Sequence, residues 1–114
     1  APPATVPLDA PFSEVVSSIT EGRKGAVAVV GADGILAGII TDGDVRRAFT
    51  RDIAAVVAAD IMSPNPKVVG PGARMSDVVD LIVQNKISNL FVTVEGRPVA
   101  IVHIAELMQA GYVS

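Results

Sequence analysis

Apolar positions in the first half of the chain follow two periodicities in turn. A stripe at helical spacing ends at Gly22, and either Asp9 or Ser13 can cap its start. Two short β-branched runs then flank a glycine-containing turn, which is the pattern of a β-hairpin. The predicted elements are an extended segment at Thr5–Pro7, a helix that opens within Leu8–Ser13 and carries Val15, Val16 and Ile19 on its apolar face, strands at Ala26–Val30 and Ile35–Ile40, and a helix over residues 42–51.

The second half repeats this order of elements. Ser13-Glu14-Val15-Val16 aligns with Ser76-Asp77-Val78-Val79, and Gly34 aligns with Gly96, so one deletion in the turn brings the halves into register. We interpret this as an internal tandem repeat. The elements predicted for the second copy are an extended segment at Lys67–Val69, a helix at Met75–Ile82, strands at Leu90–Val94 and Pro98–Val102, and a helix at Ile104–Ala110.

A predicted short helix over Ile53–Met62 and a proline-rich break at Ser63–Pro66 separate the copies. We therefore expect a first repeat at 1–52, a connecting segment at 53–66 and a second repeat at 67–114. Neither repeat buries enough surface to be stable alone. The expected fold is α/β (α+β), with two β-α-β-β-α units packed sheet to sheet around a pseudo-two-fold axis. Clefts between related halves commonly hold ligands.

Composition narrows the classes of function. A net charge of −3, with aromatic residues at only 4%, argues against nucleic acid or an anionic membrane as the main partner. The absence of cysteine excludes disulfides and thiolate metal sites, and no apolar run reaches the ~18 residues of a membrane span. The proline-rich start Ala1-Pro2-Pro3 is interpreted as the cut end of a linker in a longer protein.

The strongest candidate for a binding site is the corner Thr41-Asp42-Gly43-Asp44, where a strand gives way to a helix. Backbone N–H groups and the positive end of a helix dipole collect at such corners and suit a phosphate. The same spacing also predicts a capping box, with Thr41 as the N-cap and Asp44 three residues on. On spacing alone the cap is favoured. Asp42 opposes anion binding, because its carboxylate would repel a phosphate.

Two motifs, together with the repeat, resemble a tandem CBS-domain pair, or Bateman module. They are GIITDGD at 38–44 and DIMSPNP at 60–66. TDGDVRRAF at 41–49 and HIAELMQAGYV at 103–113 resemble more narrowly the CBS pair of arabinose 5-phosphate isomerases of the 3-deoxy-manno-octulosonate (Kdo) pathway of lipopolysaccharide. In that family a SIS catalytic domain precedes the pair. The first of these motifs also occurs in CBS pairs attached to sugar nucleotidyltransferases.

The resemblance to CBS pairs implies that Gly38, Thr41 and Asp44 bind a nucleotide. Gly38 would let the ligand approach the strand backbone, Thr41 would donate to phosphate, and Asp44 would accept from the ribose hydroxyls. Ala100, His103 and Glu106 stand at these positions in the second copy, so one good site per chain is expected. His103, the only histidine, can donate to a phosphate or carboxylate.

The resemblance also implies that both hairpin starts line the cleft, where their backbone groups could read the base. Lys24 and Lys86 are candidate cations for a second anionic group, with an ordinary surface lysine as the alternative. The residues of the two hairpin starts are Lys24, Gly25, Ala26, Ile87, Ser88 and Asn89.

The function implied is a cytoplasmic regulatory module of an isomerase that senses a nucleotide or nucleotide-sugar, such as the cytidine-monophosphate conjugate of Kdo (CMP-Kdo). An adenine nucleotide is the alternative ligand. One histidine and no cysteine offer no catalytic set, so neither catalysis by this segment nor a metal or cofactor is expected. A purely oligomerising module, with the corner merely capped, is the competing hypothesis. CBS pairs usually form homodimers through their helices, and Val56-Val57 and Leu107-Met108 would supply apolar surface.

Overall fold

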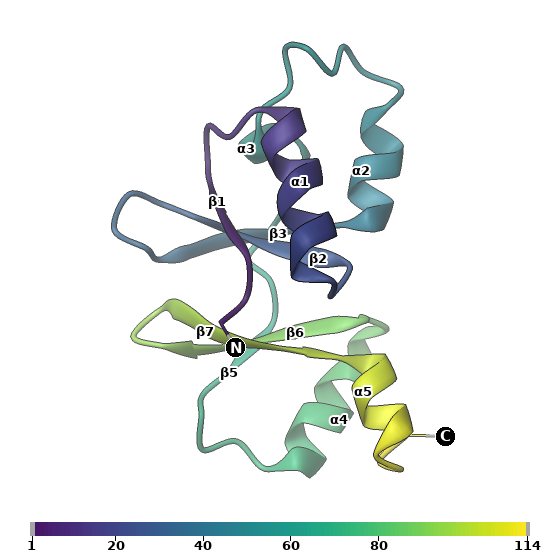
Figure 1. The fold of residues 1–114 in the computed structure, drawn as a ribbon. Helices are drawn as coiled ribbons and strands as arrows, with labels where there is room; N and C mark the ends of the chain where they lie inside the picture. Colours follow the sequence, from purple (N-terminus) through teal and green to yellow (C-terminus); the bar gives the residue numbers. More distant parts are fainter. Residues whose placement is uncertain (1, 114) are drawn as a thin grey trace.

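The chain folds into two similar halves whose β-sheets face each other, with the helices on the outer sides (Figure 1). The computed structural model describes residues 2–113. Its elements are β1 (Thr5–Pro7), α1 (Phe12–Gly22), β2 (Ala26–Val30), β3 (Leu36–Thr41), α2 (Asp42–Ala48), α3 (Ala58–Ile61), β4 (Ser63–Pro64), β5 (Val68–Val69), α4 (Met75–Asn85), β6 (Asn89–Val94), β7 (Arg97–His103) and α5 (Ile104–Gln109).

The two sheets share one topology. In each, a short strand runs parallel to the first arm of a hairpin, giving the orders β1-β2-β3-β4 and β5-β6-β7. The hairpins even carry an irregularity at equivalent places, after Val29 and after Val92. The predicted tandem β-α-β-β-α architecture is therefore confirmed. The first sheet gains one strand, because β4 from the connecting segment pairs Pro64 with Gly38.

The core of the first half explains the unbroken apolar run of β2. Val27 and Val29 are buried in one cluster with Val15 and Ile19 of α1. The alternate residues Ala26 and Ala28 are also buried, although they point to the opposite face of the sheet. That face is turned toward the second half (Figure 1), so β2 is covered on both sides. The second half repeats the arrangement with the cluster Val78, Ile82, Leu90 and Leu107.

Several predicted element ends were wrong. Pro11, not Asp9 or Ser13, precedes α1, and no side chain caps that helix. The other end of α1 is at Gly22, as predicted, and the left-handed residue that follows it is Arg23 (φ 58°), whose N–H donates to the carbonyl of Ile19. Lys86 (φ 53°) plays the equivalent part after α4.

The predicted helices around the junction were too long. The helix expected over 42–51 ends at Ala48, and the one expected over Ile53–Met62 is reduced to α3. Tertiary packing accounts for the second difference, because Val56 is buried in a small cluster with Phe12 and Ala48. With Val56 buried, residues 53–55 form a turn, and α3 begins only at Ala58.

The apolar surface expected for dimerisation is also smaller than predicted. Val56 and Leu107 are only 5% and 3% exposed, because both belong to the cores of their halves. Val16, assigned to the apolar stripe of α1, faces outward instead. Met108 remains exposed on α5. Within residues 2–113 no helix has both the length and the apolar character needed to cross a bilayer.

Candidate functional site

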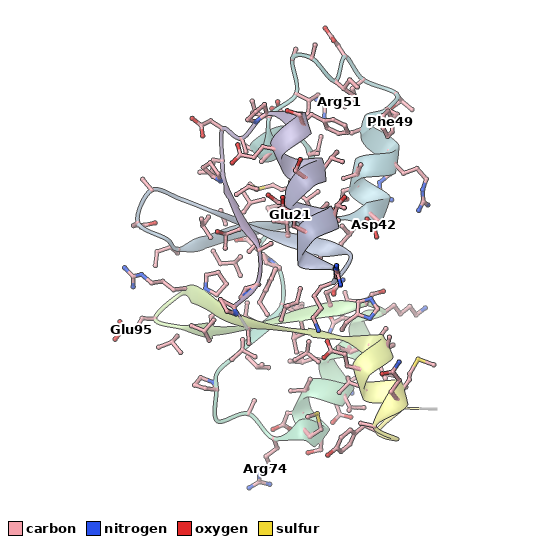
Figure 2. The ribbon with its side chains drawn as sticks, viewed as in Figure 1. Glu21, Asp42, Phe49, Arg51, Arg74 and Glu95 are labelled. Carbon is pink, nitrogen blue, oxygen red and sulfur yellow. The ribbon has the colours of Figure 1, made fainter. Side chains whose placement is uncertain are left out.

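A cavity of about 510 Å³ lies between the two halves, at the corner where β3 meets α2. The start of α2, marked by Asp42, points toward the second half, whereas Phe49 beyond its other end points away (Figure 2). The cavity draws residues from both repeats and from the segment between them. Its lining consists of Gly25, Ile39, Thr41, Asp42, Gly43, Asp44, Arg47, Ser63, Asn65, Pro66, Lys67, Ile87, Ser88, Asn89 and His103.

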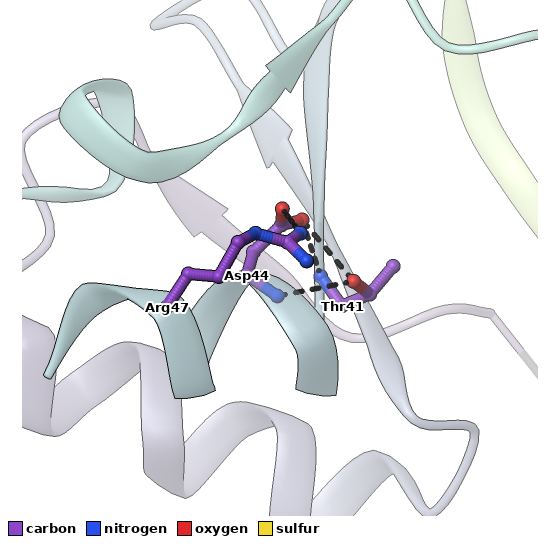
Figure 3. A network of polar contacts seen from close by, with 3 residues as sticks. All are labelled: Thr41, Asp44 and Arg47. Carbon is purple, nitrogen blue, oxygen red and sulfur yellow. Dashed lines mark hydrogen bonds and ion pairs between the residues drawn. The ribbon is translucent and has the colours of Figure 1, made fainter.

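The Thr41–Asp44 corner adopts the capping box that the spacing predicts (Figure 3). The backbone N–H of Thr41 donates to Oδ2 of Asp44 at 3.0 Å, and the Thr41 hydroxyl donates to the same oxygen at 3.2 Å. In return, the N–H of Asp44 donates to Oγ1 of Thr41 at 3.4 Å. Asp44 is only 8% exposed, so these bonds compensate for the burial of its carboxylate. The capping interpretation of this corner is correct.

The other carboxylate oxygen of Asp44 is held by Arg47. A guanidinium nitrogen of Arg47 donates to Oδ1 of Asp44 at 2.6 Å (Figure 3). The Arg47 side chain is 72% exposed, so it can leave this position at small cost. A ligand hydroxyl that approaches Asp44 would share Oδ2 with the cap or replace Arg47 at Oδ1. Capping and ligand binding are therefore compatible at Asp44.

The start of α2 offers an anion fewer free donors than expected. The N–H of Asp42 donates to the carbonyl of Gly25 at 3.1 Å, and the N–H of Asp44 is used in the cap. The positive charges in the cavity lining come instead from Arg47 and Lys67. Lys67 was not among the predicted site residues. Its position directly after the proline-rich junction between the repeats could have indicated that it lies near the cleft.

Gly38 and Ala26 do not line the cavity, whereas Gly25, Thr41 and Asp44 do. A Cβ on Gly38 would lie 2.5 Å from Sδ of Met62 and 2.9 Å from the backbone oxygen of Ser63. The missing side chain thus makes room for the chain entering β4, not for a ligand. Ala26 is only 2% exposed, within the interface between the sheets.

The equivalent corner of the second repeat is closed by a contact between the repeats. Nδ1 of His103 accepts the N–H of Ala105 at 3.0 Å, and Glu106 accepts the N–H of His103 at 3.1 Å. Glu106 also accepts a hydrogen bond from Nζ of Lys24 at 2.8 Å. Lys24 lies here, in a smaller cavity of about 280 Å³, and not in the larger one. The two corners are therefore not equivalent, and Lys24 is engaged by protein rather than free for a ligand anion.

The pKa of Glu106 is lowered, chiefly by the hydrogen bond from Lys24. Partial burial of the carboxylate opposes this shift, and the hydrogen bond from the backbone N–H of His103 lowers the pKa further. Ionised Glu106 therefore stabilises the fold above the ordinary carboxyl pKa of 4.5, and this stabilisation is lost as the pH falls through the lowered value.

We expect Glu106→Gln to lower the free energy of unfolding at pH 7 by less than about 1 kcal/mol, because both partners are partly exposed. The difference from wild type should disappear in acid, where wild-type Glu106 is also neutral. Melting temperatures of the two proteins from pH 7 to pH 3 provide the test. A difference that grows as the pH falls would contradict the assigned ion pair.

Within the described residues, no group of three or more histidine, aspartate, glutamate or cysteine side chains is placed to hold a metal ion. The lining of the larger cavity offers charged and polar contacts. Two carboxylates (buried Asp44 and exposed Asp42), two cations and polar groups from both repeats surround it. Such a set suits a ligand with both hydroxyl and anionic groups.

Comparison with known protein families matches the CBS domain twice, over residues 1–51 and 57–112. Arabinose 5-phosphate isomerase KpsF from Escherichia coli is 37% identical over 90 residues, which are 77% of this chain. The chain spans only 28% of the length of that relative.

Two solved structures have the same fold. CBS domain protein PAE2072 from Pyrobaculum aerophilum, complexed with AMP, gives a TM-score of 0.85 at 20% identity over 94% of this chain and 84% of that one. The CBS domain pair of protein MJ0100, in complex with 5′-methylthioadenosine and S-adenosyl-L-methionine, also gives 0.85, at 22% identity over 96% of this chain and 91% of that one. With two family matches that together cover nearly all of the sequence and a fold shared with solved CBS proteins, the chain belongs to the CBS-domain family as a tandem pair.

Proposed function

We propose that the larger cavity binds a nucleotide or nucleotide-sugar and that the chain is a regulatory module. The observation that carries this proposal is the lining of the cavity, which combines buried Asp44 with the cations Arg47 and Lys67. Its volume of about 510 Å³ falls in the usual range of small-molecule sites. Asp44 would accept from the ribose hydroxyls, and the two cations would hold the phosphate.

The known proteins favour different bases for the ligand. The PAE2072 structure holds AMP, and the MJ0100 structure holds 5′-methylthioadenosine and S-adenosyl-L-methionine, which supports a ligand that contains adenosine. The similarity to arabinose 5-phosphate isomerases supports CMP-Kdo, the activated sugar of the Kdo pathway. AMP and CMP-Kdo both present ribose and phosphate to the same groups. A panel of ligands can therefore decide between them.

Binding in this cavity would be transmitted because the ligand contacts both repeats. Gly25 and Thr41 belong to the first repeat, whereas Ser88 and His103 belong to the second. A ligand that contacts both repeats would change the position of one repeat relative to the other. In a full-length protein, this movement would alter an attached catalytic domain. We propose a SIS-type isomerase domain upstream, acting in the cytoplasm, with no catalysis in the CBS pair itself.

A second proposed role is self-association through the outer helices. The observation that favours it is a set of exposed apolar side chains on and beside α4 and α5, namely Met75, Val83, Met108 and Tyr112. This role is independent of the cavity. Sedimentation at several concentrations, with and without a ligand, would separate it from nucleotide binding.

A binding nucleotide should stabilise the chain by about 2.7 kcal/mol at a hundredfold excess over its Kd, because it binds the folded state only. For a domain of this size, the melting temperature should rise by on the order of 10 °C. Thermal unfolding with CMP, CMP-sugars, AMP, ADP and ATP measures the shift. If the whole panel leaves the melting temperature unchanged, the binding role is wrong and the oligomerising role remains.

A further inference from the structure

Asn89 is the one buried residue, within residues 2–113, with a side-chain oxygen or nitrogen that lacks a hydrogen-bond partner. It is 8% exposed, and its Oδ1 accepts no bond from any described group. Folded proteins rarely leave a buried acceptor unpaired, because the group has lost its water and gained nothing. Asn89 therefore calls for an explanation, and its place in the lining of the larger cavity supplies one.

The position of Asn89 is opposite the corner that holds Asp44. Asn89 is the first residue of β6 and pairs across the hairpin with His103 at the end of β7. Both of these residues belong to the second repeat and line the cavity, whereas Asp44 and Arg47 line it from the first. A ligand held by Asp44 and Arg47 on the first repeat would thus extend toward the wall of the second repeat, which contains Asn89.

The repeat itself shows that the amide is not needed for folding at this position. In the first repeat the equivalent of Asn89 is Ala26, which pairs with Thr41 as Asn89 pairs with His103. Ala26 is buried and does not line the cavity. The amide group is thus present only in the second repeat, and it lies on the wall of the cavity that also contains the Thr41–Asp44 corner.

An unpaired asparagine amide presents a hydrogen-bond donor and an acceptor side by side. Its terminal torsion is broad, and no described hydrogen bond fixes it, so either atom can turn to face the cavity. The Watson–Crick edge of a nucleobase offers the complementary pair of groups. Ribose and phosphate do not offer such a planar edge. We infer that the Asn89 side chain reads the base edge of the nucleotide, which makes it a specificity-determining residue of the cavity.

This inference rests on the proposed nucleotide-binding function, so its test compares ligands with and without a base. Calorimetric Kd values would be measured for CMP, AMP and ribose 5-phosphate on the wild-type chain and on Asn89→Ala. We expect Asn89→Ala to weaken the binding of CMP or AMP, whichever binds the wild type, by about fivefold to tenfold. Its affinity for ribose 5-phosphate should stay within about twofold of wild type.

Controls separate a lost base contact from a damaged fold. Asn89→Ala should melt within a few degrees of wild type, because Oδ1 makes no bond and alanine occupies the equivalent position. Asn89→Ser, which cannot present a donor and an acceptor side by side, should bind as the alanine variant does. Asn85→Ala removes an asparagine outside the cavity, which donates to Leu81, and should leave all affinities unchanged.

The outcomes are distinct. Unchanged nucleotide affinity in Asn89→Ala, or an equal loss for nucleotide and ribose 5-phosphate, would overturn the base-reading role while the proposed function stands. If the wild-type chain binds no nucleotide at all, the proposed function falls and the role of Asn89 falls with it. A loss confined to ligands that carry a base supports the inference.

Discussion

Replacing Asp44 with alanine is expected to weaken nucleotide binding by more than tenfold and to lower the melting temperature at the same time. The affinity falls because the ligand hydroxyls lose a charged acceptor that is 8% exposed, and such bonds contribute about 1.5–3 kcal/mol. The stability falls because the Thr41 N–H and hydroxyl lose their common acceptor, a capping loss of about 0.5–2 kcal/mol. Calorimetric titration and thermal unfolding measure the two effects separately.

The repeat provides a matched control for this variant. Glu106 occupies the same place in the cap of α5 as Asp44 does in the cap of α2, but it does not line the larger cavity. Glu106→Ala should therefore lower the melting temperature and leave the affinity unchanged. If Asp44→Ala also changed stability alone, Asp44 would be only a cap, and ribose recognition would have to lie elsewhere.

Gly38→Ala is expected to destabilise the fold by about 1–3 kcal/mol, which is typical of overpacking. The new Cβ would lie 2.5 Å from Sδ of Met62 and 2.9 Å from the backbone oxygen of Ser63. The Met62 side chain can move, but the Ser63 oxygen is backbone and belongs to β4. Avoiding the clash therefore requires β4 to shift away from β3. Denaturant unfolding of the variant measures the cost.

Two further variants make the result specific to this contact. Gly72→Ala introduces a Cβ that meets nothing within 4 Å, so it should cost far less than Gly38→Ala. Adding Met62→Ala to Gly38→Ala should not restore wild-type stability, because the Ser63 oxygen stays and Met62 itself packs against the core of the first half. An equal cost at Gly38 and Gly72 would contradict the close packing of β3 against β4.

Local patterns were sufficient to predict the fold. The helical stripe around Val15 and the β-branched run of Ala26–Val30 each lie within a few residues, and their recurrence in the second half identified the repeat. The Thr41–Asp44 capping box could likewise be predicted from the sequence, because its partners are three residues apart. Helix ends were harder to predict. Burial of Val56 against Phe12 and Ala48 shortened the helix before the junction, and only tertiary packing determines that contact.

The details of the site depend on partners far apart in the sequence. Lys24 was expected near a ligand anion, yet it pairs with Glu106, 82 residues away. Gly38 was assigned to ligand access, yet it faces Met62. The unpaired acceptor of Asn89 has no signature in the sequence, because it is defined by the absence of a neighbour in space. Residue types could therefore suggest the corner, but not which of its groups are free.

The most direct test of nucleotide binding between the repeats is backbone amide shift mapping by NMR during titration with CMP or AMP. We expect the amides of Gly43 in the first repeat and Ser88 in the second to shift together, with a common saturation curve. The amide signals of Gly70 and Val83, which lie outside both cavities, should not shift. Shifts confined to one repeat or to the Lys24–Glu106 corner, or no shifts at all, would contradict binding between the repeats.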